Sequence, residues 1–545
     1  LFRLVCTFAL RSSFVPDEQW QSTEVAHDLV FAAPNSNHHL ESRWSWEWRA
    51  GLRSPLHALL CALPLLLLRI VGADGQWMVW LAPRLLHAVV FSFADAALYS
   101  LALRLSAHDA KFARIALMLH IFNWFTAYCA PRTLANTLET SLFLIATTVY
   151  PVTSDETIRF SSRHHRYYLV GVLIDQHFER MQTLAAVSVI LRPTAALFWI
   201  PLVLLHAVRL MRAKGWSSVA RFALADCLIV GVVSVGASFA LDSWWFGRPT
   251  LALLNFARFN VFEGGSALFG VHPWHWYLSQ GLWSVAPLHF PLALVGIWIA
   301  ATKGLPTSAA QDTKKSDERR GETRSRDIVV LLPSSVLYLV VHCALAHKEH
   351  RFLLPLLPIF ALFAACAVQD VLSGWRRTVL TLVVIVNTAL FIYMARWHQT
   401  GPEAVLDAIL QHQRRNGDAP AIAALAPCYT LPERSYLHQS VRRVRGLDCS
   451  PNWSAPVDQR SRLSESSAFL SAPAEWIRSK IDGGELSEFS HIVLYENTWR
   501  LVRHLLESHG WQLCARVFHA HFLHDDHSDH HLLAVCAPTR PTTVH

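Results

Sequence analysis

This sequence has few charged residues. Only 16% of its 545 residues are Asp, Glu, Lys or Arg, whereas an average soluble domain has about 25%. By contrast, 52% of the residues are apolar, and they come in long blocks without strict alternation or a heptad repeat. The shortage of charge excludes a chain built from ordinary soluble domains, and the apolar blocks predict membrane-spanning helices.

The length of the apolar blocks predicts a polytopic α-helical membrane protein. A hydrocarbon core about 30 Å thick needs about 20 apolar residues for each helix. Residues 1–10 resemble the end of one further span, and no small-residue cleavage site follows them, so we expect no signal peptide. In total we expect about 11–13 transmembrane helices. The blocks lie at 54–72, 77–103, 112–130, 134–150, 182–208, 222–241, 286–302, 328–346, 352–371 and 378–395.

The excess of positive charge is a topology signal and does not indicate binding of nucleic acid. The net charge of +8 divides into +9 before residue 396 and −1 after it, and Lys and Arg cluster in connectors such as 209–221 and 303–326. Because these residues collect on the cytoplasmic side of a membrane, we expect 242–285, 347–351 and the residues after about 396 to face the lumen. The topology before residue 209 stays open, since one segment there must be broken or re-entrant. The candidate is 182–208, which Arg192-Pro193 interrupts.

Residues 396–545 have a different pattern from the rest of the chain. Short apolar stretches at 421–426, 491–496 and 532–537 alternate with polar loops, which predicts a small lumenal α/β domain of about 150 residues. An oxidising lumen would permit a disulfide between Cys428 and Cys449 and another between Cys514 and Cys536. Other pairings of these four cysteines, and four free thiols, stay open.

Two further features of the tail bear on modification and metals. Asn452-Trp453-Ser454 matches the glycosylation tripeptide, which would report a lumenal tail. His and Asp residues crowd into 519–531, but no second cluster with the spacing of a zinc site accompanies them. We therefore interpret this segment as a solvated hairpin loop and expect no metal.

The first polar stretch places two adjacent carboxylates, Asp17 and Glu18, directly after the first span. Carboxylates at a membrane exit are costly to hold without a purpose, and a carboxylate suits the role of base towards an acceptor hydroxyl. The alternative is that both acids cap the first turn of a helix. Trp20, Val25 and Leu29 recur at helical spacing, which predicts an interfacial helix over 17–31.

Aromatic residues with interleaved polar groups form candidate sugar-binding positions in the predicted lumenal segments. Tryptophan suits stacking on a sugar, but it also suits the aromatic belt of a membrane, and composition does not separate the two. The candidates are Trp20, Gln21, Trp46, Glu47 and Trp48 in the first loop, and His272, Trp274, His275 and Trp276 in a later one.

A cationic cluster, HKEHRF at 347–352, lies at the mouth of a predicted span. Lys348 and Arg351, with His347, could clamp a lipid phosphate, because Arg grips phosphate in a bidentate way and Lys adds a point charge. Anchoring to lipid headgroups is the alternative, but the mixed acid, imidazole and guanidinium groups favour a site. Arg132 and Arg192 lie within spans and would either extend this phosphate pocket or hold helices together.

Motifs along most of the chain resemble those of the glycosyltransferase family 22 enzymes, which have the GT-C fold and use dolichyl-phosphate mannose. These motifs are FVPDEQWQ at 14–21, RTLANTLET at 132–140, RPT at 192–194 and HKEHRF at 347–352. WEWR at 46–49, GVHPWHWYLSQG at 270–281, and the tail's PC at 427–428 with LDCS at 447–450 resemble one branch of that family. This branch adds the third mannose of the glycosylphosphatidylinositol (GPI) core through an α-1,2 linkage. The insert at 155–180, the loop at 303–327 and the His-rich end have no counterpart in this pattern.

The resemblance implies an inverting mannosyltransferase that needs no cofactor or metal. Asp17 would act as base on the 2-hydroxyl of the acceptor mannose, with Glu18 positioning or sharing that role. Lys348 and Arg351, with Arg132 or Arg192, would neutralise the leaving lipid phosphate. We expect the acidic pair to face the cationic cluster across a pocket at the edge of the bilayer.

The resemblance also implies partners, domains and location. The substrates would be dolichyl-phosphate mannose and a GPI precursor glycolipid, both held in the bilayer of the endoplasmic reticulum. Residues 1–395 would form the catalytic transmembrane domain with a lumenal catalytic loop at 13–53, and 396–545 the lumenal α/β domain. A relative that acts on N-glycan precursors or adds the fourth GPI mannose is the first alternative. A transporter is the second, but the sequence lacks the internal repeat of spans that it predicts.

Overall fold

In a computed structural model, the chain forms two compact units. The structure describes residues 1–32, 44–151, 177–306, 324–325, 327–416, 419–452, 464–523 and 526–538. We call one unit the helical unit: Leu1–Leu4, His87–Phe262 and Phe269–Phe391. The other is the sheet unit: Val5–Leu86, Glu263–Leu268 and Ile392–His545. The insert at 155–180, the loop at 303–327 and the glycosylation tripeptide fall wholly or partly outside the described residues.

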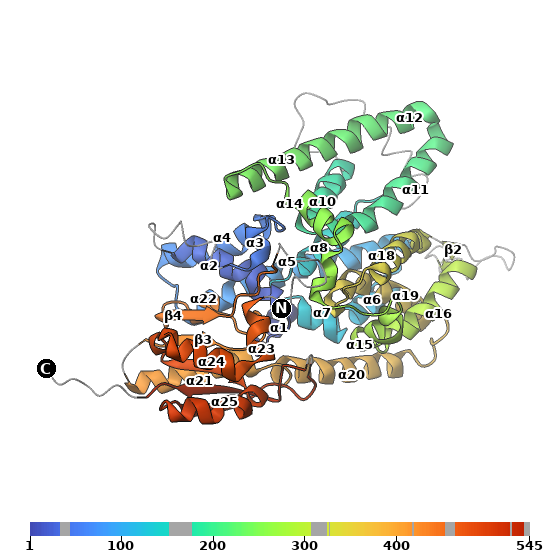
Figure 1. Cartoon of the computed structure of the whole chain (residues 1–545). Coiled ribbons are helices and arrows are strands. Elements are labelled where there is room, and N and C mark those ends of the chain that lie inside the picture. The colour runs from blue at the N-terminus through green and yellow to red at the C-terminus, as the bar shows by residue number, and fades with distance from the viewer. Residues whose placement is uncertain are drawn as a thin grey trace. The chain divides into compact units, whose positions relative to one another are not determined.

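Helices make up most of the helical unit (Figure 1). The described two-residue strands β1 (Leu305–Pro306) and β2 (Arg324–Ser325) pair in antiparallel fashion. The second half of α5 (Gln76–Leu105) and most of α20 (Arg376–Arg396) belong to this unit. The other helices are α6 (Ala110–Ile121), α7 (Trp124–Cys129), α8 (Ala135–Thr147), α10 (His177–Leu191), α11 (Ala196–Lys214), α12 (Trp216–Arg221), α13 (Ile229–Phe246), α14 (Ala252–Ala257), α15 (Leu282–Val285), α16 (His289–Thr302), α18 (Leu332–Ala344) and α19 (Leu357–Asp370).

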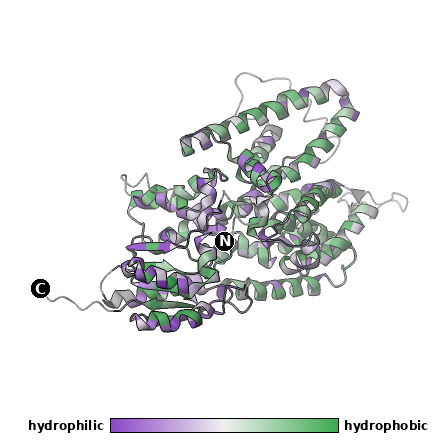
Figure 2. Cartoon of the chain, in the orientation of Figure 1, coloured by the Kyte–Doolittle hydropathy of each residue, from purple (hydrophilic) through white to green (hydrophobic). Residues whose placement is uncertain are grey.

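Six helices in the described ranges are long and apolar enough to cross a membrane, or up to seven if a helix pair bent by 108° is one span. The protein is therefore a multi-span helical membrane protein, and Figure 2 shows apolar residues along most of α13. The prediction of about 11–13 spans is too high by this criterion. The blocks at 112–130 and 134–150 form shorter helices, of which α8 has 13 residues. At 1.5 Å per residue such a helix covers only about 20 Å of a core about 30 Å thick.

Two local features explain how the helices of this unit are arranged. Helix α10 ends at Leu191 and a 3₁₀ turn begins at Pro193, so the segment 182–208 breaks where the proline predicted a break. Helices α16 and α19 approach closely at Gly296. A Cβ added there would lie 1.7 Å from the carbonyl oxygen of Phe363, so no residue with a side chain fits at this spacing. Small residues permit such contacts between membrane helices.

The sheet unit contains a five-stranded mixed sheet of order β4-β3-β5-β7-β6. Its strands are β3 (Ala421–Ala424), β4 (Arg443–Gly446), β5 (His491–Tyr495), β6 (Gln512–Phe518) and β7 (His531–Cys536). Strand β3 runs parallel to β4 and β5, whereas β7 is antiparallel to β5 and β6. The predicted apolar stretches become β3, β5 and β7, and the His-rich segment connects β6 to β7 as the predicted hairpin.

Helices cover the sheet because its central strands are apolar on both faces. All residues of β3 and β5 are buried, and two hydrophobic clusters divide them between the faces. One cluster includes Trp499 and Val502 of α25 (Glu496–Ser508), and the other includes Val405 and Ile409 of α21 (Gly401–Asn416). The remaining tail helices are α22 (Arg434–Leu437), α23 (Glu465–Ser471) and α24 (Pro473–Asp482).

The N-terminal part of the sheet unit holds the predicted catalytic loop. Most of α1 (Phe2–Ala9) and the first half of α5 belong here with a π-turn (Gln19–Thr23), α2 (Glu24–Phe31), α3 (Trp46–Arg49) and α4 (Leu56–Val71). The structure forms a helix over most of the predicted 17–31 segment, but Glu24, His27 and Asp28 are buried. The protein itself covers the polar side of α2, and the place of this helix at a membrane surface stays a prediction.

Candidate functional site

The structure gives the two adjacent carboxylates different surroundings. The side chain of Glu18 is 0% exposed and lies 2.9 Å from the guanidinium of Arg84. Arg84 also lies 3.4 Å from Glu403 of α21 and stacks over the ring of Trp80. A buried ion pair of this kind fixes the segment in place, and removing one partner would leave an uncompensated charge.

Asp17 is less buried than Glu18 and begins the turn that leads into the π-turn. The backbone N–H of Glu18 donates to Val15, and those of Gln19 and Trp20 donate to Pro16. The chain around the carboxylates is thus locally fixed while Asp17 keeps partial solvent access. This geometry favours Asp17 over Glu18 as a base, because a base must reach its substrate.

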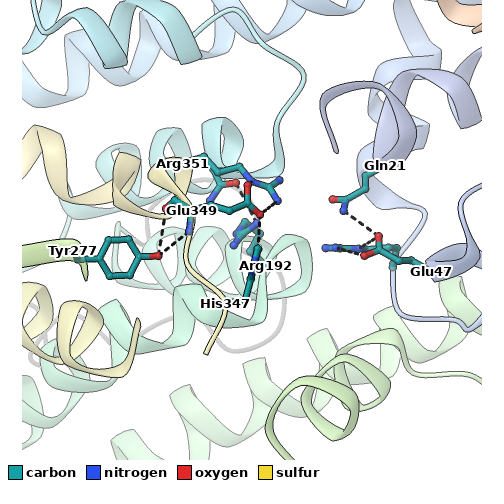
Figure 3. A network of polar contacts seen from close by, with 9 residues as sticks. Gln21, Glu47, Arg192, Tyr277, His347, Glu349 and Arg351 are labelled. Carbon is teal, nitrogen blue, oxygen red and sulfur yellow. Dashed lines mark hydrogen bonds and ion pairs between the residues drawn. The ribbon is translucent and has the colours of Figure 1, made fainter. Parts of the chain in front are cut away.

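The predicted sugar-binding residues of the first loop already have partners within the protein. Glu47 accepts hydrogen bonds from Gln21 at 3.0 Å and from Arg53 at 3.1 Å (Figure 3). The indole N–H of Trp48 donates to the carbonyl of Trp20, and Trp48 is 1% exposed. Trp46 is 6% exposed. Packing accounts for both of these buried rings, and their contact with a sugar stays a prediction.

In the helical unit, the HKEHRF motif is organised around its acid. Glu349 accepts hydrogen bonds from both Nε and Nη2 of Arg351, and His347 Nε2 lies 2.8 Å from the same carboxylate (Figure 3). The backbone N–H of Glu349 donates to the hydroxyl of Tyr277, which in turn donates to the Glu349 carbonyl at 3.3 Å. The bidentate pairing of Glu349 with Arg351 orients the guanidinium and restricts its motion.

Burial and charge act in opposite directions on Glu349. Burial of the carboxyl group raises its pKa, but the guanidinium of Arg351 beside it and the hydrogen bonds from His347 and Arg351 outweigh this effect. The net result is a pKa well below the usual value for Glu, so the group is ionised at neutral pH. Glu349 therefore supplies one fixed negative charge to a cluster of three basic side chains.

Lys348 links this motif to the second predicted aromatic segment. Its ammonium donates to the carbonyls of His272 and Leu345. The imidazole of His272 packs on Trp276 at 5.0 Å between ring centroids, and Trp276 also contacts His350 at 4.9 Å. The structure thus brings predicted acceptor-binding residues next to predicted phosphate-binding residues.

The two arginines predicted to extend the phosphate pocket differ. Arg192 pairs with Glu139 at 3.0 Å, and its guanidinium lies 5.2 Å from the ring of Phe352, the same ring that Arg351 contacts at 5.3 Å. Arg132 is 0% exposed and stacks over Tyr128 at 4.0 Å. Arg192 is therefore connected to the HKEHRF motif, whereas Arg132 occupies a packed position.

The remaining aromatic candidates also divide by exposure. Trp274 is 67% exposed and Trp276 is 8% exposed. His275 is exposed, and its Nδ1 lies 3.2 Å from the hydroxyl of Ser279. Of the two tryptophans, Trp274 has the open ring face that stacking on a sugar requires.

Cysteines of the tail form two disulfides in the sheet unit. Cys428 is bonded to Cys449, with 5.9 Å between the Cα atoms, and Cys514 is bonded to Cys536. Ligand atoms of His412, His491 and Cys536 lie within 4.8 Å of one another. This group could hold a metal only if Cys536 were a free thiolate, which the disulfide prevents.

Sequence reasoning missed the groups that organise these clusters. Glu349 stands between His347 and Arg351 in the motif, and this interleaved acid was a signal for an internal ion pair. Arg84 lies within a predicted span, where an ionisable group indicates a pocket or a pairing contact, but the sequence does not show its partner. Tyr277 carries no local signal, because its partner is distant in the sequence. The acidic pair and the HKEHRF motif belong to different units, so their predicted approach stays a prediction.

The structure is similar in fold to a solved protein structure. ArnT from Cupriavidus metallidurans bound to undecaprenyl phosphate matches with a TM-score of 0.54, covering 98% of this chain and 95% of that one. At 12% sequence identity this likeness shows the fold alone, and it establishes the predicted GT-C architecture.

Sequence similarity to known proteins extends over nearly the whole chain. GPI alpha-1,2-mannosyltransferase 3 of Mus musculus is 30% identical over 524 residues, which covers 95% of this chain and 84% of the relative. GPI mannosyltransferase 3 of Trypanosoma brucei brucei is 28% identical and covers 89% of this chain and 84% of the relative. The model of the Alg9-like mannosyltransferase family matches residues 1–438. The chain belongs to the Alg9-like mannosyltransferase family and is a mannosyltransferase.

Proposed function

We propose that this enzyme adds the third mannose of the GPI core, transferring it from dolichyl-phosphate mannose through an α-1,2 linkage onto the second mannose. One observation carries the proposal. Relatives named as GPI mannosyltransferase 3, from mouse to trypanosome, match 89–95% of this chain. The similarity thus continues past residue 438, where the family model ends. The branch motifs at 46–49, 270–281, 427–428 and 447–450 support the same assignment.

The proposed reaction is a single in-line displacement with inversion. Asp17 removes the proton from the 2-hydroxyl of the acceptor mannose. The oxygen of this hydroxyl attacks C1 of the donor mannose, and the bond from C1 to the phosphate oxygen breaks. A carboxylate is sufficient because inversion needs one base and no covalent intermediate. Glu18 has a positioning role, since its buried pairing with Arg84 fixes the segment that carries Asp17.

The proposed phosphate-binding group is the HKEHRF motif with Arg192. Arg351, oriented by Glu349, and Lys348 stabilise the negative charge that develops on the leaving dolichyl phosphate. His347 adds a donor that shares Glu349 with Arg351. These cations would perform the charge neutralisation that a metal performs in other transferases, and we propose no metal or other cofactor.

We place the reaction in the endoplasmic reticulum membrane, with Asp17 and the C-terminal sheet on the lumenal side. Both substrates are lipids, so the bilayer confines them to one plane and reduces the entropy cost of bringing them together. The proposed partners are dolichyl-phosphate mannose, the GPI precursor and the bilayer. Clustered Lys and Arg in the connector 209–221 support a cytoplasmic location for that loop.

Loss of the protein tests the proposed step. Cells of the source organism that lack this chain should accumulate GPI precursors with two mannoses, and the wild-type chain should restore longer species. The Asp17→Asn variant at equal abundance should not restore them. Accumulation of species with one or three mannoses, or of truncated N-glycan precursors, would assign the chain to another step of the same family.

A further inference from the structure

The sheet unit contains a large cavity that the proposed chemistry does not use. Its volume is about 920 Å³, within the range of about 300–1,000 Å³ typical of ligand pockets. Segments from the N-terminal loop and from the C-terminal sheet form its wall, and all of them belong to the sheet unit. The residues that carry the following argument are Trp20, Asp28, Trp44, Arg49, Tyr429 and Gly446.

The aromatic wall of the cavity is fixed by hydrogen bonds. Trp20 and Tyr429 pack with ring centroids 4.7 Å apart, and the indole N–H of Trp20 donates to the Leu431 carbonyl at 3.1 Å. The indole N–H of Trp44 donates to Asp28 at 3.2 Å. Ring surfaces held in this way are preorganised for apolar contact with a ligand.

Asp28 supplies a buried acceptor that the protein leaves unused. The residue is 4% exposed, and one carboxylate oxygen, Oδ2, accepts from Trp44. The other oxygen, Oδ1, is buried without a hydrogen-bond partner among the described residues, and His27 Nδ1 lies 3.9 Å away, beyond hydrogen-bond distance. Buried polar atoms are nearly always paired, so this oxygen calls for a donor from a ligand.

Glu24, a second buried acid of the cavity, differs from Asp28 because the protein satisfies its carboxylate. Glu24 accepts from the backbone N–H groups of Glu433, Arg434 and Ser435, and from the Ser435 hydroxyl. Its carboxylate therefore serves to join α2 to α22. Asp28 has no such structural use for Oδ1, which makes it the better candidate for ligand contact.

Arginines add anion-binding groups to the wall. Arg49 contacts Asp448 at 3.4 Å and the Ser450 hydroxyl at 2.5 Å, and Arg445 pairs with Glu465 at 3.1 Å. Their side chains are each 39% exposed. Guanidinium groups, carboxylates and indole rings together suit a ligand with many hydroxyl groups, and they are a poor lining for a lipid chain.

We propose that this cavity binds the carbohydrate headgroup of the acceptor glycolipid, with Asp28 accepting a hydrogen bond from a sugar hydroxyl. The assignment rests on the proposed function. Continuity with the catalytic segment favours the acceptor over the donor: Trp20 donates its backbone N–H to Pro16, directly before Asp17. The headgroup therefore contacts the same turn that carries the proposed base.

Gly446 offers a way to fill the cavity without disturbing the fold. A Cβ at this position would meet only the carboxylate of Glu433, at 3.5 Å, which is ordinary van der Waals contact. Gly446 ends the edge strand β4, so a β-branched residue is compatible with its backbone. Gly446→Val should occupy space in the cavity, whereas Gly446→Ala is the matched control.

The test measures steady-state transfer by the full-length enzyme in nanodiscs, varying the acceptor glycolipid at saturating dolichyl-phosphate mannose. We expect Gly446→Val and Asp28→Asn to raise the acceptor KM about 10-fold, with little change in kcat or in the donor KM. The exposed Asp482→Asn on α24 should behave like wild type, and Gly446→Ala, which adds a single methyl group, should raise the acceptor KM less than Gly446→Val. Binding of a soluble α-linked dimannoside, followed by saturation-transfer NMR, should weaken in Gly446→Val and Asp28→Asn.

The outcomes separate this inference from the proposed function. If the wild-type enzyme prefers an acceptor with another number of mannoses, the assigned step is wrong, but both cavity variants should still raise the KM for that acceptor. If both variants fold, as thermal unfolding reports, and their acceptor KM and dimannoside binding equal those of wild type, the cavity assignment is overturned. A rise in the donor KM alone would overturn it as well.

Discussion

The two units of this enzyme organise charge in opposite ways. In the sheet unit two buried acids, Glu18 and Glu403, share the single guanidinium of Arg84. In the helical unit two basic groups, His347 and Arg351, share the single carboxylate of Glu349. Asp17 directly precedes Glu18 in the chain, and Lys348 directly precedes Glu349. We propose that Asp17 acts as the base beside the first cluster, and that Lys348 and Arg351 bind the phosphate at the second.

Removing the proposed base should have the largest effect on activity. We expect Asp17→Asn to lower kcat about 100–10,000-fold, because it removes the general base without changing side-chain volume. The thermal midpoint should stay near that of wild type, since Asp17 is only partly buried. Glu18→Gln should instead lower the thermal midpoint, and equal loss of activity without loss of stability would contradict the division between these carboxylates.

Changing the shape of the proposed phosphate-binding cation Arg351 comes next. Arg351→Lys keeps the charge but loses the fork that pairs with Glu349, and we expect kcat to fall about 100-fold. The exposed Arg503→Lys on α25 serves as the control for an Arg-to-Lys change. Undiminished turnover in Arg351→Lys would mean that charge alone is sufficient at this position.

Removing the Cys428–Cys449 disulfide should lower the stability of the protein more than replacing a free cysteine of the helical unit. This disulfide closes a loop within the sheet unit, and Cys449 lines the cavity. The paired Cys428→Ser, Cys449→Ser variant should lose about 2–4 kcal/mol of unfolding free energy. Cys227→Ser, a free thiol in the helical unit, should change stability by less than about 0.5 kcal/mol. Equal losses in the two variants would contradict a localised stabilisation.

The smallest effect concerns pH. Burial and the nearby carboxylate of Glu24 raise the pKa of Glu433 to about 8. The folded state then binds more protons than the unfolded state between the ordinary Glu pKa and about 8, so stability should decline as pH rises through this window. Glu433→Gln should flatten this decline in thermal unfolding scans. Glu349 has the opposite sign, because its lowered pKa makes its contribution present at neutral pH and lost only under acidic conditions.

The sequence predicted the elements that have a continuous apolar signature. Strands β3, β5 and β7 are buried central strands and were predicted, whereas β4 and β6 are the edges of the sheet and carry polar residues such as Arg443 and Gln512. The helices α6, α7 and α8 merged into longer predicted spans, because an apolar block does not reveal a short break. Periodicity therefore gave the fold class and the central strands but not the span count.

The sequence predicted which residues form the candidate site, but it did not predict the ion pairs and hydrogen bonds between them. HKEHRF indicated a cationic site, yet the pairing of Glu349 with Arg351 depends on the backbone geometry of a turn. The pairing of Glu18 with Arg84 joins segments that only the tertiary fold brings together. Asp28 gave no signal, since its unused oxygen is defined by the groups around it.

The affinity for the donor tests most directly whether Asp17 acts as base and Arg351 binds the donor phosphate. Equilibrium binding of a short-chain polyprenyl-phosphate mannose should be measured with the wild-type enzyme, Asp17→Asn and Arg351→Lys, each in nanodiscs. The account predicts an unchanged Kd for Asp17→Asn and a Kd about 10-fold higher for Arg351→Lys. Loss of donor binding in Asp17→Asn, with wild-type affinity in Arg351→Lys, would contradict it.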